Sequence, residues 1–375
     1  MSFVEYESIL SNVLLHGIVD NDYQYHLKKG GFILLKRKNS IWIISALIVL
    51  LLLSACGQAA TTSNTTETTT TGAADTESST DSTSASGAAT TTGAEGETVT
   101  YQSDAGEVQV PVDPKRIIDL TAFSTGYFVA LDAPVVGATS GAINNKYIKD
   151  QLKSEGATDL GEQPTAEQLI SLKPDLIIAY TSMEGLDKLS QIAPVVQLQY
   201  GKRNFKDLML EMGKLTNREA QAKDWISQWE AKINELKPKV LAAVGDRTVS
   251  ILNPYAKGLF VFGHNYGRGG EILYDEFGLK APKRAQTEAI DSGTGWASIS
   301  MEVLPEYAGD IIFTSPWSGD TTDPKIVYDN TVWKNLTAVK EGHVFQLDPT
   351  SDTYNDPVSL EGQLKFISDS LLSVK

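Results

Sequence analysis

The chain has 375 residues and a formal net charge of −15, from 32 Lys+Arg against 47 Asp+Glu. This acidic balance argues against nucleic acid as a partner, because phosphate binding needs a cationic surface. Hydrophobic residues make up 41% of the chain, enough for buried cores, and the length suggests two domains once flanking segments are removed.

An export signal is predicted in residues 34–56. Basic residues at 36–38 precede an apolar run, Ile41–Leu53, that is too short to span a bilayer comfortably and is followed by small residues. Residues 53–56, Leu-Ser-Ala-Cys, resemble the bacterial lipobox, in which the cysteine is lipidated and becomes the new N-terminus. Cys56 is the only cysteine, so neither an internal disulfide nor a cysteine-based metal cluster is expected. The alternative is a buried cysteine in a short membrane helix.

Residues 1–33 precede this signal and have no assigned role. Residues 29–31, Lys-Gly-Gly, are what a purine-rich ribosome-binding site would encode, so we expect translation to begin at Leu34 or Leu35. After the signal, residues 57–97 are mainly Thr, Ser, Ala and Gly, which cannot bury apolar surface, and we expect a disordered tether. These segments predict a protein lipid-anchored on the extracellular face of the cell membrane, not a spanning one.

A first series of strands and helices is predicted in residues 98–215, the expected N-terminal lobe. Short apolar runs typical of strands occur at 116–120, 176–179 and 195–198, and they alternate with helical stretches such as Ala166–Leu172. Strands separated by helices imply parallel βαβ units.

One long helix, from about Asn217 to Val244, is predicted in the linker, residues 216–245. Thr216–Glu219 fits a capping box at its start. Apolar residues then recur at helical spacing: Trp225, Trp229, Ile233, Leu236 and Val240. We interpret this aromatic stripe as packing against the lobes in preference to a ligand contact.

A second series follows in residues 246–375, the expected C-terminal lobe. Its strand-like runs are Thr248–Leu252, Ile311–Phe313 and Val344–Leu347. The predicted fold is therefore α/β, with two Rossmann-like lobes that have parallel-rich sheets and are bridged by one long α-helix.

One segment of each lobe repeats the same pattern without gaps. Thr165–Leu169 leads after five residues to Asp175 and three apolar residues, and Ser300–Leu304 leads after five to Asp310 and three apolar residues. Each hydroxyl residue is expected to cap a short helix that feeds a buried strand. The glutamate at the third position then lies in the first turn, where the helix dipole favours a carboxylate.

The two glutamates of this pattern are Glu167 and Glu302. Helix-end stabilisation is a sufficient reason for either one alone, but not for the same acid at the same offset in both lobes. Two equivalent lobes would display them as a symmetric pair, which suits docking onto a two-fold partner with basic residues. Docking and simple capping stay open as alternatives.

In these features the region from Val99 to Lys375, together with the lipobox, resembles the substrate-binding lipoproteins of ABC importers. The resemblance is to the class III periplasmic-binding-protein fold, in which a single long helix bridges two α/β lobes. It implies a monomeric receptor without enzymatic activity. It also implies that Glu167 and Glu302 contact arginines on the two permease subunits of the importer.

Within this class the chain is similar to the ferric hydroxamate siderophore binders of Gram-positive bacteria. The most specific segments are Phe262–Tyr274, which contains Asn-Tyr-Gly-Arg-Gly-Gly at 265–270, and Tyr354–Pro357. Segments typical of the wider class are Gly295–Ala297, Trp333–Leu336 and Glu341–Val344.

The resemblance implies that Tyr266 and Arg268 line the siderophore pocket and that Tyr200 contacts the ligand from the first lobe. The family usually has tryptophan where Tyr266 stands, and aromatic residues where this chain has Asp352 and Thr353. Both departures leave the identity of the siderophore open.

The expected ligand is a pre-formed Fe(III)-siderophore complex, so neither a cofactor nor a metal-binding side chain is expected. Arg268 offers planar donors that match the outward-facing oxygens of such a complex. Tyrosines add flat apolar area with a polar tip, and tryptophans could extend this wall, although core packing suits Trp296 equally well. The expected ligand-binding residues are Tyr266, Arg268, Tyr200, Tyr354, Trp296 and Trp317. We expect them in the cleft between the lobes, at the C-terminal ends of the parallel strands.

Other functions have weaker support. A zinc or manganese site needs three or four clustered ligands, and after the signal the chain has only His264 and His343. Because His264 and Tyr266 are possible axial ligands, a binder of haem, cobalamin or another metal chelate is the alternative. Gly267–Gly270 is compatible with a phosphate loop but lacks its lysine. No nucleophile with a paired histidine occurs at motif-like spacing, which argues against catalysis. A siderophore-modifying hydrolase is the alternative within the enzyme class.

Overall fold

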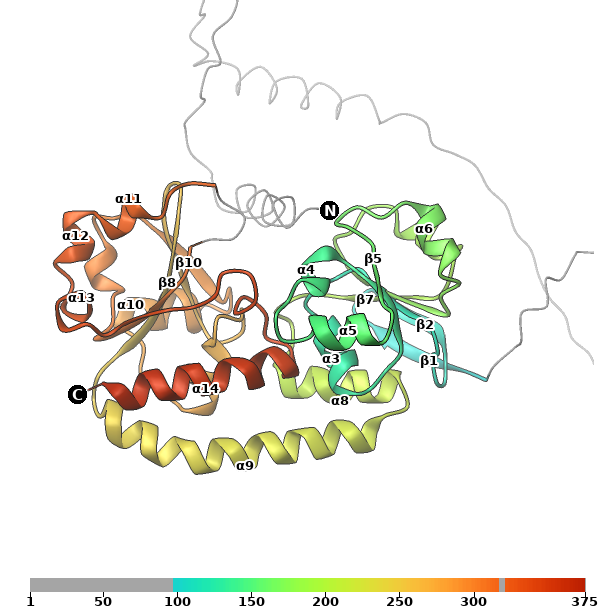
Figure 1. Cartoon of the computed structure of the whole chain (residues 1–375), viewed down its shortest axis with the longest axis horizontal. Helices are drawn as coiled ribbons and strands as arrows, with labels where there is room; N and C mark the ends of the chain where they lie inside the picture. The colour runs from blue at the N-terminus through green and yellow to red at the C-terminus, as the bar shows by residue number, and fades with distance from the viewer. Residues whose placement is uncertain (1–96, 317–320, 375) are drawn as a thin grey trace, which may run out of the picture. The chain divides into compact units, whose positions relative to one another are not determined.

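The computed structural model describes residues 97–316 and 321–374 (Figure 1). The predicted export signal with Cys56, residues 57–96 of the tether and Trp317 lie outside the described residues. No helix in these ranges is long and apolar enough to cross a membrane.

The first lobe contains an all-parallel sheet of five strands in the order β5-β4-β3-β6-β7. The strands are β3 (Ile117–Asp119), β4 (Val135–Ala138), β5 (Thr158–Asp159), β6 (Leu176–Tyr180) and β7 (Val195–Leu198). The helices are α3 (Thr125–Ala130), α4 (Ser140–Ile143), α5 (Lys149–Ser154), α6 (Ala166–Ser171), α7 (Leu186–Leu189) and α8 (Phe205–Leu215). An antiparallel hairpin, β1 (Thr98–Ser103) and β2 (Gly106–Pro111), precedes them. The predicted parallel βαβ series is therefore confirmed.

The second lobe contains a mixed sheet of five strands in the order β10-β9-β8-β11-β12. The strands are β8 (Val249–Tyr255), β9 (Gly258–Phe262), β10 (Trp296–Ile299), β11 (Ile311–Thr314) and β12 (Val344–Gln346). Strand β11 runs parallel to β8 and β12, but β9 is antiparallel to β8 and β10. Only residues 256–257 join β8 to β9, and so short a connection can make a hairpin but not a parallel crossover.

Short helices surround this second sheet, and the C-terminal helix α14 (Pro357–Ser373) packs on α3 of the first lobe. The short helices are η1 (Glu271–Glu276), α10 (Lys283–Ala285), η2 (Gln286–Ile290), η3 (Leu304–Glu306), α11 (Lys325–Tyr328), α12 (Thr331–Lys334) and α13 (Thr337–Glu341).

Helix α9 (Glu219–Val244) links the two lobes and lies alongside α14 (Figure 1). Its stripe packs as predicted: Phe205 of α8 contacts Trp225 and Trp229 edge to face, and Trp229 and Ile233 are buried. The largest buried cluster takes side chains from α9, α14 and both sheets. Apolar burial therefore fixes the linker helix to the lobes.

The start of α9 differs from the predicted capping box. Thr216 ends α8, where its hydroxyl donates to the Met212 carbonyl at 2.7 Å. Asn217 follows with φ of 56°, a left-handed conformation that ends the helical path of α8. Arg218 is therefore the N-cap residue of α9. The predicted Thr216 cap is wrong because the hydroxyl bonds backward to the preceding helix.

The two repeated segments share a sequence pattern but form different kinds of helix. In the first lobe Thr165 caps α6 and forms a capping box with Gln168. In the second lobe residues 301–303 form a turn, followed by the short 3₁₀ helix η3 with Val303 at its N-cap, so the short helix forms but the predicted Ser300 cap is wrong. Pro305 explains the 3₁₀ form, since it lacks the N–H that an α-helix would donate to Met301.

The aspartates of the two repeats have equivalent roles. Asp175 accepts hydrogen bonds from the backbone N–H groups of Lys115 and Arg116, at the start of β3. Asp310 accepts from the backbone N–H and hydroxyl of Thr248, at the start of β8. Each aspartate thus fixes the entry of the neighbouring strand, which gives a physical reason for its presence in both lobes.

Candidate functional site

The lobes meet where loops follow the carboxyl ends of the first sheet. Phe123 follows β3, Gly141 lies in helix α4, which follows β4, and Tyr200 follows β7. Two second-lobe segments contact this edge, the loop at 263–270 and the segment at 348–359. In open α/β sheets this edge is the usual ligand side.

The aromatic rings of Tyr200 and Tyr266 touch across the boundary between the lobes. Their centroids lie 5.2 Å apart at 89°, and Tyr200 also packs edge to face on Phe123 at 5.0 Å. Beside this contact, Asn265 Nδ2 donates to the Gly201 carbonyl at 3.1 Å. The two tyrosines predicted to oppose each other across a ligand therefore contact each other directly in this structure.

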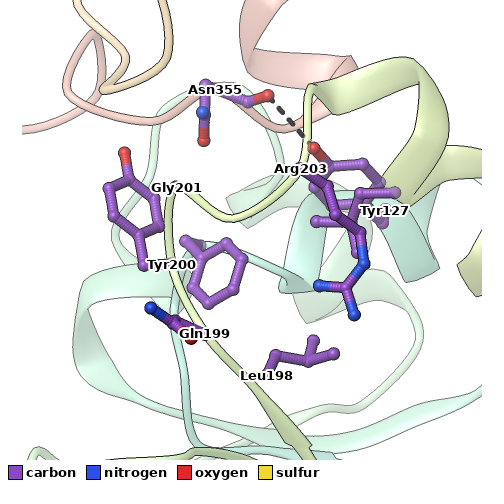
Figure 2. A pocket seen from close by; sticks show the side chains of 9 residues that line it. Tyr127, Leu198, Gln199, Tyr200, Gly201, Arg203 and Asn355 are labelled. Carbon is purple, nitrogen blue, oxygen red and sulfur yellow. Dashed lines mark hydrogen bonds between the residues drawn. The ribbon is translucent and has the colours of Figure 1, made fainter. Parts of the chain in front are cut away.

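A pocket opens beside Tyr200, almost entirely on the first-lobe side (Figure 2). Asn355 is its second-lobe member and accepts, through its backbone carbonyl, a long hydrogen bond of 3.4 Å from the Tyr127 hydroxyl. The lining residues are Phe123, Tyr127, Leu198, Gln199, Tyr200, Gly201, Arg203, Leu208 and Asn355. Of the predicted ligand residues, Tyr200 lines this pocket, whereas Tyr266, Arg268, Tyr354 and Trp296 do not.

Two glycines make room for the Tyr266 ring. A Cβ at Gly295 would lie 2.1 Å from Tyr266 Cδ2, and one at Gly201 would lie 3.1 Å from Tyr266 Cε2. Both glycines have positive φ, 81° and 73°, which side chains rarely adopt. Burial raises the pKa of the Tyr266 hydroxyl, so it stays a neutral donor at any working pH.

Arg268 is held by its own loop. Its φ of 59° is a left-handed backbone conformation, and its backbone N–H donates to the Asp352 carbonyl at 2.8 Å. Its Nη1 donates to the Tyr266 carbonyl at 2.7 Å, and the guanidinium lies 3.9 Å from the centroid of the Phe262 ring. Stacking on an aromatic face and a fixed backbone preorganise this planar donor group.

Tyr354 and Trp296 join the site from different sides. The Tyr354 hydroxyl lies 2.9 Å from where a Cβ on Gly141 would stand, and Arg268 is close enough to lower the Tyr354 pKa against the larger raising effect of burial. Trp296 pairs with Phe262 across β10 and β9, so it shares the sheet face on which Arg268 stacks. The structure brings Tyr200, Tyr266, Arg268 and Tyr354 together and places Trp296 at their border.

Glu271 is a buried carboxyl that sequence reasoning missed. It is 1% exposed, and its Oε1 accepts from the Gly267 backbone N–H at 3.1 Å and from Asn355 Nδ2 at 2.7 Å. Within the described ranges its Oε2 has no hydrogen-bond partner, and burial raises its pKa to about 7. A glutamate after two glycines at a helix start gives no sequence signal that separates this position from an exposed helix end.

Asp352 is a second missed residue. Its side chain, 6% exposed, accepts from the Tyr147 hydroxyl at 2.6 Å and pairs with Lys146 Nζ at 3.2 Å. Because its carbonyl also binds the Arg268 N–H, Asp352 connects the Arg268 loop to the first lobe. Its one sequence signal is the departure from the aromatic residues that the resembled family has there.

Glu167 and Glu302 are both exposed, on α6 and on the turn before η3. Hydrogen bonds from its own backbone N–H and from Thr165 lower the pKa of Glu167, and bonds from Ser300 and its own backbone N–H lower that of Glu302. Both glutamates are therefore ionised at neutral pH. In the described part of the chain no group of three or more His, Cys, Asp or Glu could hold a metal ion.

Comparison with known proteins agrees with the two-lobed fold. The family model described as periplasmic binding protein matches residues 117–350. The iron(3+)-hydroxamate-binding protein FhuD of Bacillus subtilis is 43% identical over 277 residues, which is 73% of this chain and 87% of that protein.

Two crystal structures are also similar. A periplasmic binding protein component of a Fep/Fec-like ferrichrome ABC transporter from Bacillus subtilis has a TM-score of 0.67 at 40% identity, covering 73% of this chain and all of that one. FhuD2 from Staphylococcus aureus with bound ferrioxamine B has a TM-score of 0.64 at 32% identity, covering 70% of this chain and 99% of that one. These matches confirm the predicted resemblance, and the chain belongs to the periplasmic binding protein family.

Proposed function

We propose that this protein is the extracellular receptor of an ABC importer, and that it binds a ferric hydroxamate siderophore and delivers it for iron uptake. The carrying observation is the convergence of Tyr200 from one lobe with Tyr266 and Arg268 from the other. Similarity to proteins named for iron(3+)-hydroxamate binding supports the same ligand class. The role is binding and delivery, without a catalytic step.

The chemistry of the site suits a complex whose metal is already coordinated. In a ferric trihydroxamate six hydroxamate oxygens fill the coordination sphere of iron, and their remaining lone pairs can accept hydrogen bonds from outside the complex. Arg268, stacked on Phe262, would donate to these oxygens with charge-assisted hydrogen bonds. The rings of Tyr200, Tyr266 and Tyr354 would pack on the apolar chelator backbone.

Ligand entry requires a change at the tyrosine contact. Because Tyr200 and Tyr266 touch at 5.2 Å, a compact chelate fits between them only after the rings separate. That separation breaks the hydrogen bond between Asn265 and Gly201. We place the movement in the loop at 263–270, and expect it to be modest because a single helix joins the lobes.

Delivery would use the exposed surface of both lobes. Glu167 and Glu302 are ionised and reachable, so each suits a basic residue on a permease subunit. A lipid anchor at Cys56 would keep the monomeric receptor at the extracellular face of the membrane, near the importer.

Fluorescence titration of the purified protein with ferric trihydroxamates, ferric catecholates, ferric citrate, haem and cobalamin tests the proposed function. We expect saturable tryptophan quenching by a ferric trihydroxamate. Arg268→Ala should weaken binding at least about tenfold, the equivalent of one lost charged hydrogen bond, while far-UV circular dichroism stays unchanged. Saturable binding of haem or cobalamin alone would refute the hydroxamate assignment, and unchanged affinity in Arg268→Ala would remove Arg268 from the site.

A further inference from the structure

A carboxylate that the proposed ligand set does not use lies at the same edge of the first sheet. Glu162 follows β5, and its Oε1 accepts a hydrogen bond of 3.0 Å from the backbone N–H of Gly141. The Tyr354 hydroxyl lies against the same glycine, 2.9 Å from where its Cβ would stand. Glu162, Gly141 and Tyr354 therefore meet at one place on the ligand side of the sheet.

Among the described residues, no Lys or Arg side chain supplies a compensating positive charge to the Glu162 carboxylate. This carboxylate is partly exposed, burial raises its pKa, and Asp159 raises it further. Lys146 is engaged elsewhere, at 3.2 Å from Asp348 and from Asp352. A negative charge in this position favours a cation brought by a ligand.

The charges at the site thus differ in sign between the two lobes. Arg268 supplies positive charge from the second lobe, and Glu162 supplies negative charge from the first, with Tyr354 close enough for both to influence its pKa. The ferric trihydroxamate core is neutral, because three hydroxamate anions balance the ferric ion. A protonated amine on the chelator tail would be attracted by Glu162 while the core oxygens face Arg268.

We infer that Glu162 is a specificity-determining residue that selects ferric trihydroxamates carrying a protonated amine and orients them with the amine toward the first lobe. This inference rests on the proposed function and narrows its ligand class. Any hydrogen-bond acceptor at this position would satisfy the Gly141 N–H. A variant that loses the charge but keeps the acceptor therefore separates attraction of the ligand amine from the structural bond to Gly141.

The test uses two probes, a linear ferric trihydroxamate that ends in a primary amine and the same complex with the amine acetylated. We expect the full chain to bind the amine form about three- to tenfold more tightly, the range of a partly screened ion pair. Glu162→Gln, which keeps the acceptor for Gly141, should bind both probes alike. Glu107→Gln, which removes an exposed carboxylate on the β1–β2 hairpin, is the matched control and should keep the preference.

Three outcomes are informative. A preference in the unmodified protein that disappears in Glu162→Gln and weakens with added salt supports the inference. Equal affinity for both probes, or a preference that survives Glu162→Gln, overturns it while leaving the proposed function intact. Failure of the unmodified protein to bind either ferric complex overturns the proposed function and the inference together.

Discussion

Two regions join the lobes around the site, and they differ in burial and bonding. The first is the strap, residues 348–359, which contacts the first lobe through buried polar groups: Asn145 Nδ2 donates to Ser359 Oγ at 2.9 Å, and both side chains are fully buried. The second is the tyrosine contact, Tyr200 with Tyr266, which has partly exposed rings and lies beside the hydrogen bond from Asn265 to Gly201. Buried hydrogen bonds separate at higher cost than exposed ones. From this difference we expect the strap to hold the lobes together while the tyrosine contact opens.

The largest effect on stability is expected from a substitution at Gly126, which lies against the strap. This glycine lies in α3, and a Cβ there would be 1.8 Å from Oδ1 of Asp356, the fully buried N-cap of α14. Gly126→Ala should therefore lower the free energy of unfolding by about 3 kcal/mol or more in urea denaturation, although alanine favours helices. Gly156→Ala is the control, because a Cβ there would meet no other atom. Its φ of 76° is strained for alanine, so this variant should lose about 1 kcal/mol of unfolding free energy. A stability equal to that of the control would contradict the role of the strap.

A pH-dependent effect is expected at Glu271, which bonds both to Asn355 of the strap and to Gly267 in the loop of the tyrosine contact. Burial raises its pKa from 4.5 in the unfolded chain to about 7 in the folded one, so its favourable contribution is present below about pH 4.5 and is lost as the pH rises to about 7. Glu271→Gln removes this loss. The variant should gain about 2–3 kcal/mol relative to the unmodified protein between pH 4.5 and pH 8.

Denaturant unfolding across that pH range, with both proteins in the same buffers, measures the difference. The isosteric amide keeps an acceptor for Gly267 and Asn355, so loss of packing does not confuse the comparison. A stability difference that is flat from pH 4.5 to pH 8 would show that Glu271 does not titrate in this window. If protonation of Glu271 also affects ligand binding through Gly267, the siderophore affinity of the unmodified protein changes through pH 7, while that of Glu271→Gln does not.

The contrast between strap and tyrosine contact explains which features the sequence predicts. Local patterns predict strands β3, β6, β7, β8, β11 and β12, the long helix α9 and the Thr165 cap, because each depends on neighbours a few residues apart. The antiparallel β9 was missed because its direction depends on a two-residue connection after β8 that the apolar runs do not reveal.

Long-range contacts account for the rest. Asp352 is buried by residues about 200 positions away, at Lys146 and Tyr147, and Glu271 by Asn355, so neither environment can be inferred from local composition. Tyr266 and Arg268 were found through family resemblance, not through spacing. Their direct contact with Tyr200 and Phe262 follows from tertiary packing, which sequence periodicity does not specify.

The smallest effect on stability is expected at Asn265, beside the tyrosine contact. Asn265→Ala removes the partly exposed bond to the Gly201 carbonyl and should lower the free energy of unfolding by no more than about 1 kcal/mol. Under the proposed ligand entry between Tyr200 and Tyr266 the same bond breaks first, so the variant should associate with a ferric trihydroxamate faster, by up to about fivefold. Stopped-flow quenching measures this rate. An unchanged association rate together with a large loss of stability would reverse the comparison and make the tyrosine contact part of the permanent joint between the lobes.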